Sequence, residues 1–184
     1  MRKSQNGMDS LRLAEIEDIP ALNELIAESA RGLSARYYTA EQIEAAVRYI
    51  FGVDTQLIID RTYYLITRGP VLIACGGWSR RRTLFGGDQA KGRTDPLLDP
   101  ATEAARIRAF FVHPDVARQG LGARLMRTCL AAVVEFGFQT LELVATLPGA
   151  PLYEAFGFVS IERFSVKVSN GVEVPIVRMH RDVR

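Results

Sequence analysis

The residues best suited to do chemistry lie in segment 111–124, where an apolar run ends and a helical pattern begins. The pattern predicts a strand, a His113-Pro114 turn, a loop containing Gly120 and Gly122, and then a long helix. Glycine lets backbone N–H groups converge on a ligand without a side chain in the way. The first turn of a helix adds unpaired N–H donors and the positive end of the helix dipole. The segment is therefore suited to bind an anion such as phosphate, with Arg118 as a cation at its rim.

Two glycines alone are also consistent with a tight turn between a strand and a helix. We therefore compared the segment with the known phosphate-binding motifs. The P-loop pattern G-x-x-x-x-G-K-[ST] is absent. A dinucleotide fingerprint requires a third glycine where Leu125 stands. It also requires an acidic residue at a strand end about 20 residues further on, whereas Glu142 stands in mid-strand. ATP and NAD are therefore disfavoured as ligands.

The elements that must position this loop follow from hydrophobic periodicity and turn residues. Alternating or β-branched runs predict strands at 11–13, 62–67, 71–79, 104–112, 139–145, 158–168 and 172–180. Helical spacing predicts four helices. The first begins after Asp18 and ends at Gly32, and the second begins at the Thr39/Gln42 capping box and ends near Gly52. The other two span 121–136 and 151–156. Pro175 in the last strand requires an edge position or a bulge. The expected fold class is α/β (α+β), a mixed sheet with helices on its faces.

One segment, 80–103, shows no sustained periodicity and contains several glycines and prolines. A loop of this length inside a compact domain is a functional lid or a mobile segment. It begins with three arginines, Arg80–Arg82, which favour a solvated loop start. Trp78 just before it is expected in the core, like Cys75 and Cys129, which have no histidine nearby in sequence.

Composition limits the classes of protein that need to be considered. The chain has 184 residues, 48% of them hydrophobic and 24% charged, which suits one globular domain, expected at 11–184 after a flexible terminus at 1–10. A net charge of +2 gives no argument for nucleic acid. Neither a membrane helix of about 20 apolar residues nor a secretory signal is visible. Two cysteines form no disulfide framework or zinc cluster, so the cytosol is the expected compartment and no metal is expected.

Two separated motifs in this order resemble the GCN5-related N-acetyltransferase (GNAT) family. The first is V-H-P-x-x-x-R-Q-G-L-G-x-x-L at 112–125, and the second is A-P-L-Y-E-A-F-G-F at 150–158. The resemblance implies a GNAT-like mixed, mostly antiparallel central sheet of about six to seven strands with helices on both faces. It also implies acetyl-CoA as cosubstrate. By this resemblance the pyrophosphate is held by Arg118, Gln119, Gly120, Leu121, Gly122 and Ala123, and the pantetheine arm meets backbone groups of Phe110, Phe111 and Val112.

The resemblance also assigns catalytic roles. The tyrosine of the second motif, Tyr153, would protonate the leaving thiolate, although the sequence alone favours an aromatic core residue there. Many family members carry a glutamate as general base where this chain has Arg106. Glu103 at the start of that strand is the candidate base, acting through a water. Glu142 and His113 are weaker candidates, and each of the three is also explained as a solvated or turn residue.

The expected function is transfer of an acetyl group from acetyl-CoA to an amine by direct attack in a ternary complex. The acceptor, a small molecule or a protein amine, is not readable from the sequence, and a homodimer is a familiar arrangement for the family. Because Arg106 replaces the usual carboxylate, a non-catalytic acyl-CoA-binding sensor on the same fold is the alternative. An unrelated α/β nucleotide binder is the third option. Neither nucleic acid nor membrane is an expected partner.

Overall fold

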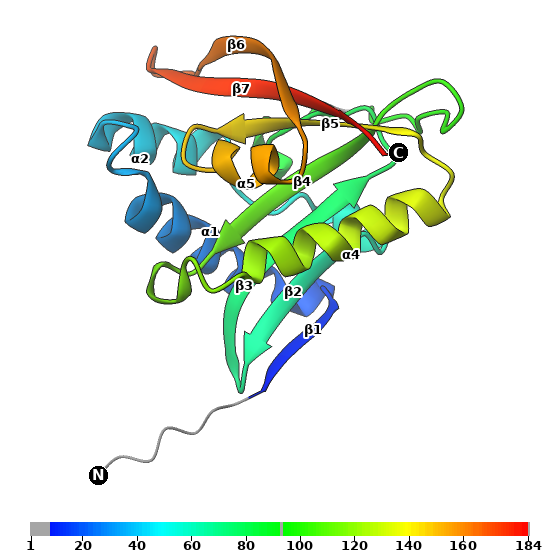
Figure 1. Ribbon diagram of the computed structural model, residues 1–184. Helices are drawn as coiled ribbons and strands as arrows, with labels where there is room; N and C mark the ends of the chain where they lie inside the picture. Colours follow the sequence, from blue (N-terminus) through cyan, green and yellow to red (C-terminus); the bar gives the residue numbers. More distant parts are fainter. Residues whose placement is uncertain (1–7, 93, 184) are drawn as a thin grey trace.

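A computed structural model describes residues 8–92 and 94–183, and a seven-stranded sheet in the order β1-β2-β3-β4-β5-β7-β6 forms its centre (Figure 1). The strands are β1 (Asp9–Leu13), β2 (Tyr63–Arg68), β3 (Val71–Ser79), β4 (Ala105–Val112), β5 (Thr140–Thr146), β6 (Val159–Lys167) and β7 (Glu173–Asp182). The helices are α1 (Ile19–Ser34), α2 (Ala40–Tyr49), α3 (Thr55–Ile59), α4 (Leu121–Glu135) and α5 (Ala150–Ala155). The predicted order of elements is confirmed, except that α3 was not predicted.

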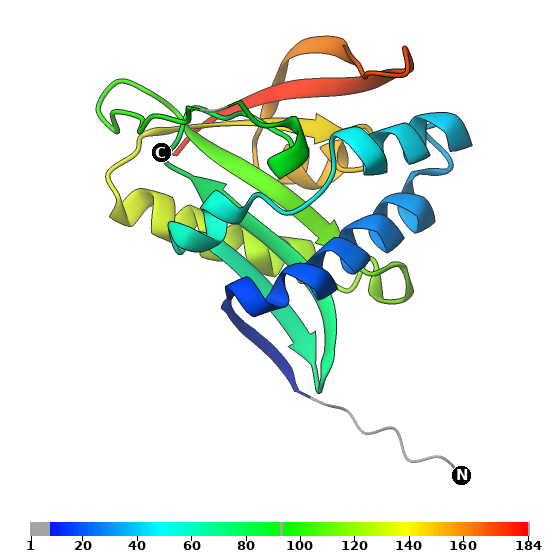
Figure 2. The same ribbon diagram turned by 180° about the vertical axis from the view of Figure 1, so that it is seen from behind.

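The sheet is mixed but mostly antiparallel, as expected. Among the described strands, β4 and β5 are parallel and every other neighbouring pair is antiparallel. Helix α4 covers one face of the sheet, and α1 and α2 lie on the opposite face (Figures 1 and 2). The predicted fold class is therefore confirmed.

The two central parallel strands are joined at one end only. β4 pairs with β5 through two register positions, Ala105 with Leu141 and Arg106 with Glu142. β5 instead pairs with β7 along its whole length, from Thr140 to Thr146. Beyond Arg106, β4 therefore keeps β3 as its neighbour and diverges from β5, which opens a wedge in the middle of the sheet.

Helix α1 is longer than predicted, because it continues through Gly32. The residue does not end the helix; it makes room for the turn that follows β4. A Cβ built on Gly32 would overlap with the side chain of Pro114. The short helix α3 begins at an N-cap, Asp54, whose carboxylate accepts from the N–H of Gln56 at 3.0 Å.

Other local predictions are confirmed in detail. The Thr39 hydroxyl accepts from the N–H of Gln42, and the Gln42 side chain accepts from the N–H of Thr39, which is the predicted capping box. Pro175 lies in β7, which is not an edge strand, but β5 pairs with β7 only from Ile176 onward. At Pro175 the strand therefore has β6 on one side only, so its missing N–H removes no bond to β5.

The predicted flexible terminus, 1–10, needs correction at its end. Residues 1–7 lie outside the described residues, but Asp9 and Ser10 belong to β1. The Asp9 carboxylate accepts two hydrogen bonds from the Arg68 guanidinium, at 2.7 and 3.0 Å. These contacts place residues 9 and 10 within the folded domain.

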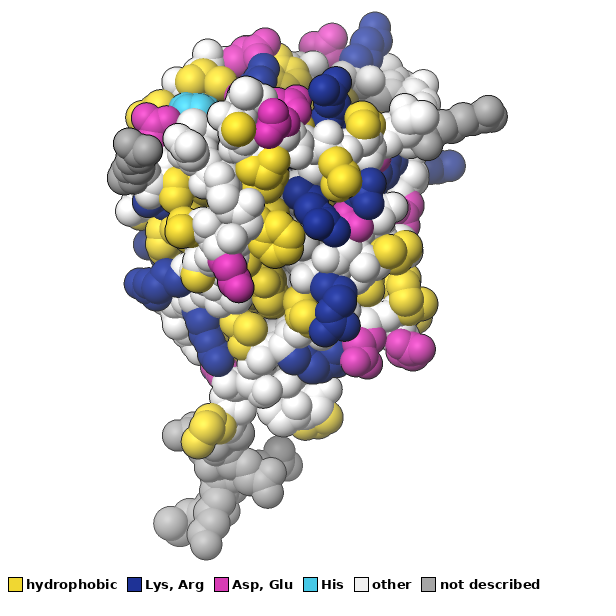
Figure 3. All heavy atoms as spheres, turned by 90° about the vertical axis from the view of Figure 1, so that its right-hand side faces the viewer, with side chains coloured by type: hydrophobic (Ala, Val, Ile, Leu, Met, Phe, Trp, Pro, Cys, Tyr) yellow, Lys and Arg dark blue, Asp and Glu magenta, His cyan; other side chains and the backbone are white. Residues whose placement is uncertain are grey.

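The surface and the buried cysteines agree with the composition. In the face shown in Figure 3, basic and acidic side chains are interspersed with hydrophobic ones. Within 8–92 and 94–183, no helix has the length and apolar character needed to cross a membrane. Trp78 is buried in the core as predicted, and Cys75 and Cys129 are both buried and free.

Gly32→Ala tests the close packing of α1 against the turn after β4. Alanine favours a helix by about 1 kcal/mol over glycine. The contact with Pro114 should outweigh that gain, and we expect a net loss of about 1–2 kcal/mol in the free energy of unfolding, measured in urea. Gly92→Ala is the control, since its Cβ would meet no described atom within 4 Å. A Gly32→Ala protein as stable as the control would contradict the packing.

Candidate active site

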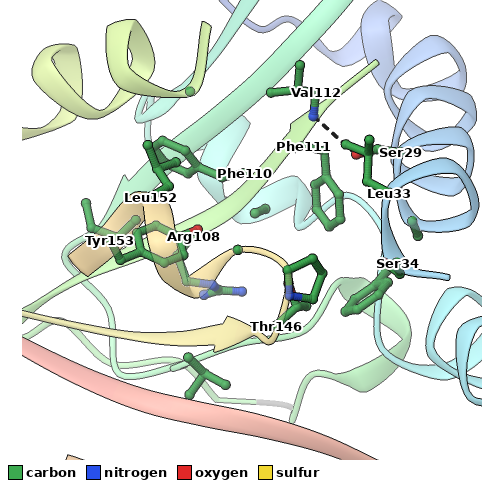
Figure 4. A pocket seen from close by; sticks show the side chains of 18 of the residues that line it. Ser29, Leu33, Ser34, Arg108, Phe110, Phe111, Val112, Thr146, Leu152 and Tyr153 are labelled. Carbon is green, nitrogen blue, oxygen red and sulfur yellow. Dashed lines mark hydrogen bonds between the residues drawn. The ribbon is translucent and has the colours of Figure 1, made fainter. Parts of the chain in front are cut away.

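A cavity of about 570 Å³ occupies the wedge between β4 and β5 (Figure 4). This volume lies within the ordinary range for small-molecule sites. Its walls come from β4, the start of α4, α5, α1 and the loop after β3. Nine of the predicted site residues line it: Phe110, Phe111, Val112, Arg118, Gly120, Leu121, Gly122, Ala123 and Tyr153.

The glycine loop forms one end of the cavity and leads into an uncapped helix. Arg118 and Gly120 both adopt left-handed backbone conformations, with φ of 66° and 83°. No side chain caps the N-terminus of α4. The first backbone hydrogen bond of this helix runs from the N–H of Arg124 to the carbonyl of Gly120, at 3.0 Å. The N–H groups before Arg124 are therefore without helical partners, and they come from residues that line the cavity. This end can accept an anion.

Gln119 is the one predicted loop residue that does not line the cavity. Its side-chain oxygen accepts from Nη2 of Arg68 at 3.2 Å. Nearby, Nη1 of Arg124 donates to the carbonyl of Asp9 at 3.1 Å. The Gln119 side chain thus ties the loop to β2, the Arg124 side chain ties it to β1, and contact of Gln119 with the ligand stays a prediction.

Strand β4 carries a local irregularity where it faces the wedge. Ala109 has φ of 54°, and the register between β3 and β4 shifts between Cys75 and Gly77. The Tyr63 hydroxyl donates to the carbonyl of Ala109 at 3.1 Å. Such irregularities re-aim backbone groups, and here they lie on the part of β4 that has no β5 partner. The Val112 N–H donates to the Ser29 hydroxyl at 3.2 Å (Figure 4), and the backbone groups of β4 beyond Arg106 have no partner on β5.

Tyr153 belongs both to the core and to the cavity wall. Its ring lies edge-on to Phe110 and Phe158, with centroid distances of 6.1 and 6.0 Å. The residue is 7% exposed and lines the cavity. Burial raises the pKa of its phenol above the ordinary value, so the hydroxyl keeps its proton at neutral pH.

The candidate bases lie elsewhere. Glu103 accepts from the N–H of Asp99 at 2.8 Å and pairs with Arg82 at 3.4 Å. Glu142 accepts from Arg106 and from Arg178, each at 2.9 Å.

Nδ1 of His113 accepts from the N–H of Asp115 at 3.2 Å. Neither His113 nor the two glutamates line the cavity, and among the described lining residues there is no carboxylate or imidazole. Glu103 therefore lies outside the cavity wall, where its carboxylate closes a turn, and its role as a base stays a prediction.

The sequence analysis missed a buried ion pair in the cavity wall. Arg108 is 3% exposed, lines the cavity, and donates to Asp54 at 3.0 Å. It also donates to the carbonyls of Thr83 at 2.9 Å and Gly86 at 2.7 Å. Burial lowers the pKa of Arg108, and the Asp54 carboxylate opposes that effect. The signal was Arg108 itself, the single charged residue within the apolar run 107–112.

The loop at 80–103 is held by the same network. Nζ of Lys91 donates to both carboxylate oxygens of Asp54, at 2.8 and 3.1 Å, and pairs with Asp95 at 3.0 Å. Arg81 pairs with Asp60, so this arginine is part of the fold and not of a free basic patch. Residues 84–87 of this loop form a wall of the cavity.

Comparison with known proteins identifies the class to which this fold and cavity belong. Residues 23–158 match the family model described as "Acetyltransferase (GNAT) family". The match covers most of the chain, and the protein therefore belongs to this family, as the two motifs indicated. The chain matches no curated protein sequence.

Solved structures share the fold over the whole length. A GCN5-related N-acetyltransferase from Rhodopseudomonas palustris has 19% identity and a TM-score of 0.69, with 95% of this chain and 96% of that chain covered. The paia N-acetyltransferase from Thermoplasma acidophilum, solved with coenzyme A, has 13% identity and a TM-score of 0.63, covering 95% and 99%. The yncA protein from Salmonella typhimurium, solved with acetyl-CoA, has 13% identity and a TM-score of 0.60, covering 96% and 94%.

Gly120→Ala tests whether the glycine loop binds the cofactor's phosphates. The added methyl would enter the open space at this end of the cavity, so CoA affinity measured by calorimetry should fall about 10-fold or more. Gly137→Ala is a matched control at the other end of α4, because it has φ of 86° and equally open surroundings. Both variants carry similar backbone strain, and only the first should lose affinity. Equal affinities in the two variants would place the phosphates elsewhere.

Proposed function

We propose that the protein transfers the acetyl group of acetyl-CoA to an amine by direct attack in a ternary complex. The observation that carries the proposal is the continuous cavity between β4 and β5, which joins unpaired strand backbone to the uncapped N-terminus of α4. Membership of the GNAT family supports acetyl-CoA as the donor. In this proposal the phosphates bind at the glycine loop, and the pantetheine arm lies along β4 from Val112 toward Phe110.

The chemistry requires one bond to form and one to break. The amine lone pair attacks the thioester carbon, and the carbonyl oxygen takes the negative charge. Backbone N–H groups of β4 that lack a β5 partner are suited to stabilise this charge, and such stabilisation is usually the largest single contribution. The carbon–sulfur bond then breaks, the CoA thiolate leaves, and the nitrogen loses its proton. The products are the amide and CoA thiol.

In this proposal Tyr153 supplies the proton to the leaving sulfur. The raised pKa of its phenol makes it a weaker acid, which by itself argues against the role. Burial raises the pKa of a thiol in the same way, however. A thiolate released in the same desolvated surroundings is a correspondingly stronger base, so the transfer of the proton stays feasible.

The alternative is a sensor that binds acyl-CoA without turnover. The specific observation in its favour is that no carboxylate or imidazole is found among the described residues that line the cavity. We favour the enzyme, because a neutral amine needs no base to attack and can release its proton afterwards to water. Cytosolic location and a homodimer stay predictions.

Thiol release separates the two candidates. We expect the protein to release CoA thiol from acetyl-CoA in the presence of a suitable amine, detected with a thiol reagent, and to form the corresponding amide, detected by mass spectrometry. Calorimetry with CoA is run in parallel. CoA binding without amide formation from any amine of a broad panel would favour the sensor.

Tyr153→Phe tests the proton donor. The change keeps the ring contacts with Phe110 and Phe158 and removes only the hydroxyl, so turnover should fall by about 10²–10⁴ while CoA affinity stays nearly unchanged. Tyr64→Phe is the control, because Tyr64 packs against the same core cluster but does not line the cavity. If both variants turn over at the wild-type rate, Tyr153 only packs.

A further inference from the structure

The end of the cavity away from the glycine loop is apolar. Its walls include Ile50 from the end of α2, Phe85 from the 80–103 loop, Val144 of β5 and Ile176 of β7. These four residues belong to one apolar cluster, which is distinct from the cluster that contains Leu121 beside the glycine loop. The two ends of the cavity therefore offer different chemistry, an anion site at one end and a hydrocarbon surface at the other.

The charged groups of the cavity are both cations. Of its described lining residues, Arg108 and Arg118 are the ones that carry charge, and Arg118 belongs to the glycine loop. At the apolar end, Arg108 is already paired with Asp54 and bonded to two carbonyls. The Asp54 carboxylate thereby offsets its charge, and the three bonds use three of its five N–H groups. This end is close to neutral.

An ammonium group is poorly stabilised in such surroundings. Moving a cation from water into an apolar site without a counter-ion is costly, and the group loses its proton instead. The reacting amine must be neutral in any case, because only the free base attacks the thioester. A second ammonium group on the acceptor does not react, so it has no reason to lose its proton and would stay charged. No described residue of the cavity wall carries a carboxylate to pair with it.

We propose, on the basis of the proposed acetyl transfer, that the acceptor is an apolar molecule that carries one primary amine and no second charge. Its hydrocarbon or aromatic body lies against Phe85, Val144 and Ile176, and its nitrogen points toward β4. Polyamines and other polycations are excluded because no described residue of the cavity wall supplies a counter-ion, and amino acids because Asp54 already offsets the charge of Arg108. The buried ion pair of Asp54 with Lys91 ties down the loop that carries Phe85.

Calorimetry on the CoA-loaded protein tests the acceptor class without relying on turnover. The probes are phenethylamine, spermidine and phenylalanine, each titrated at the same pH. We expect phenethylamine to bind at least ~10-fold more tightly than either of the others. Tighter binding of spermidine or phenylalanine, or binding of none of the three, would overturn the inference. Failure of CoA itself to bind would instead refute the proposed function.

Three variants sharpen the test. Thr146→Asp adds a carboxylate to the cavity wall and should narrow or reverse the preference for phenethylamine over spermidine. Thr128→Asp adds the same charge on α4 away from the cavity and should leave the preference unchanged. Phe85→Ala, which adds no charge and keeps the loop's ion pairs, should weaken phenethylamine binding about 10-fold with CoA affinity retained. If Thr146→Asp fails to fold, Phe85→Ala alone decides, because unchanged phenethylamine affinity would contradict the apolar wall.

Discussion

The site depends on the separation of β4 from β5, two strands that a regular sheet would keep hydrogen-bonded. They stay together at Arg106 and Glu142, where the two side chains form an ion pair that Arg178 of β7 joins. Past this point β5 follows β7, and the facing edge of β4 has no strand to bond with. Unpaired backbone groups inside a protein are costly unless something satisfies them. A ligand with polar groups along an extended chain fits that requirement.

A second buried ion pair determines what else fits in the wedge. Arg108 points from β4 into the cavity wall, and Asp54 holds it together with Lys91 of the 80–103 loop. Breaking a buried pair is costly, so the three elements stay in place together. The loop was predicted to be a lid or a mobile segment, and its residues 84–87 form part of the wall of the site. Phe85 of this loop lines the cavity. The end of the cavity at the glycine loop carries the cation Arg118 and suits the phosphates of CoA, whereas the other end is close to neutral and suits the apolar acceptor.

The sequence was most informative where local rules act. Gly120 and the helix after it, the Thr39 capping box and the strand periods all follow from neighbouring residues, so these elements were predictable. Gly32 was misread as a helix end because its role is a contact with Pro114, a residue far along the chain. Tertiary packing also places Glu103 outside the cavity wall and pairs Arg108 with Asp54. No local sequence pattern encodes either arrangement.

Hydrogen exchange measured with and without CoA tests the central claim most directly. If the wedge binds the cofactor, the amides of the first turn of α4 and of β4 from Phe110 to Val112 should exchange more slowly when CoA is present. These amides either lack a helical partner or lie where β5 has diverged. Protection confined to other parts of the chain, or no protection at saturating CoA, would contradict the account.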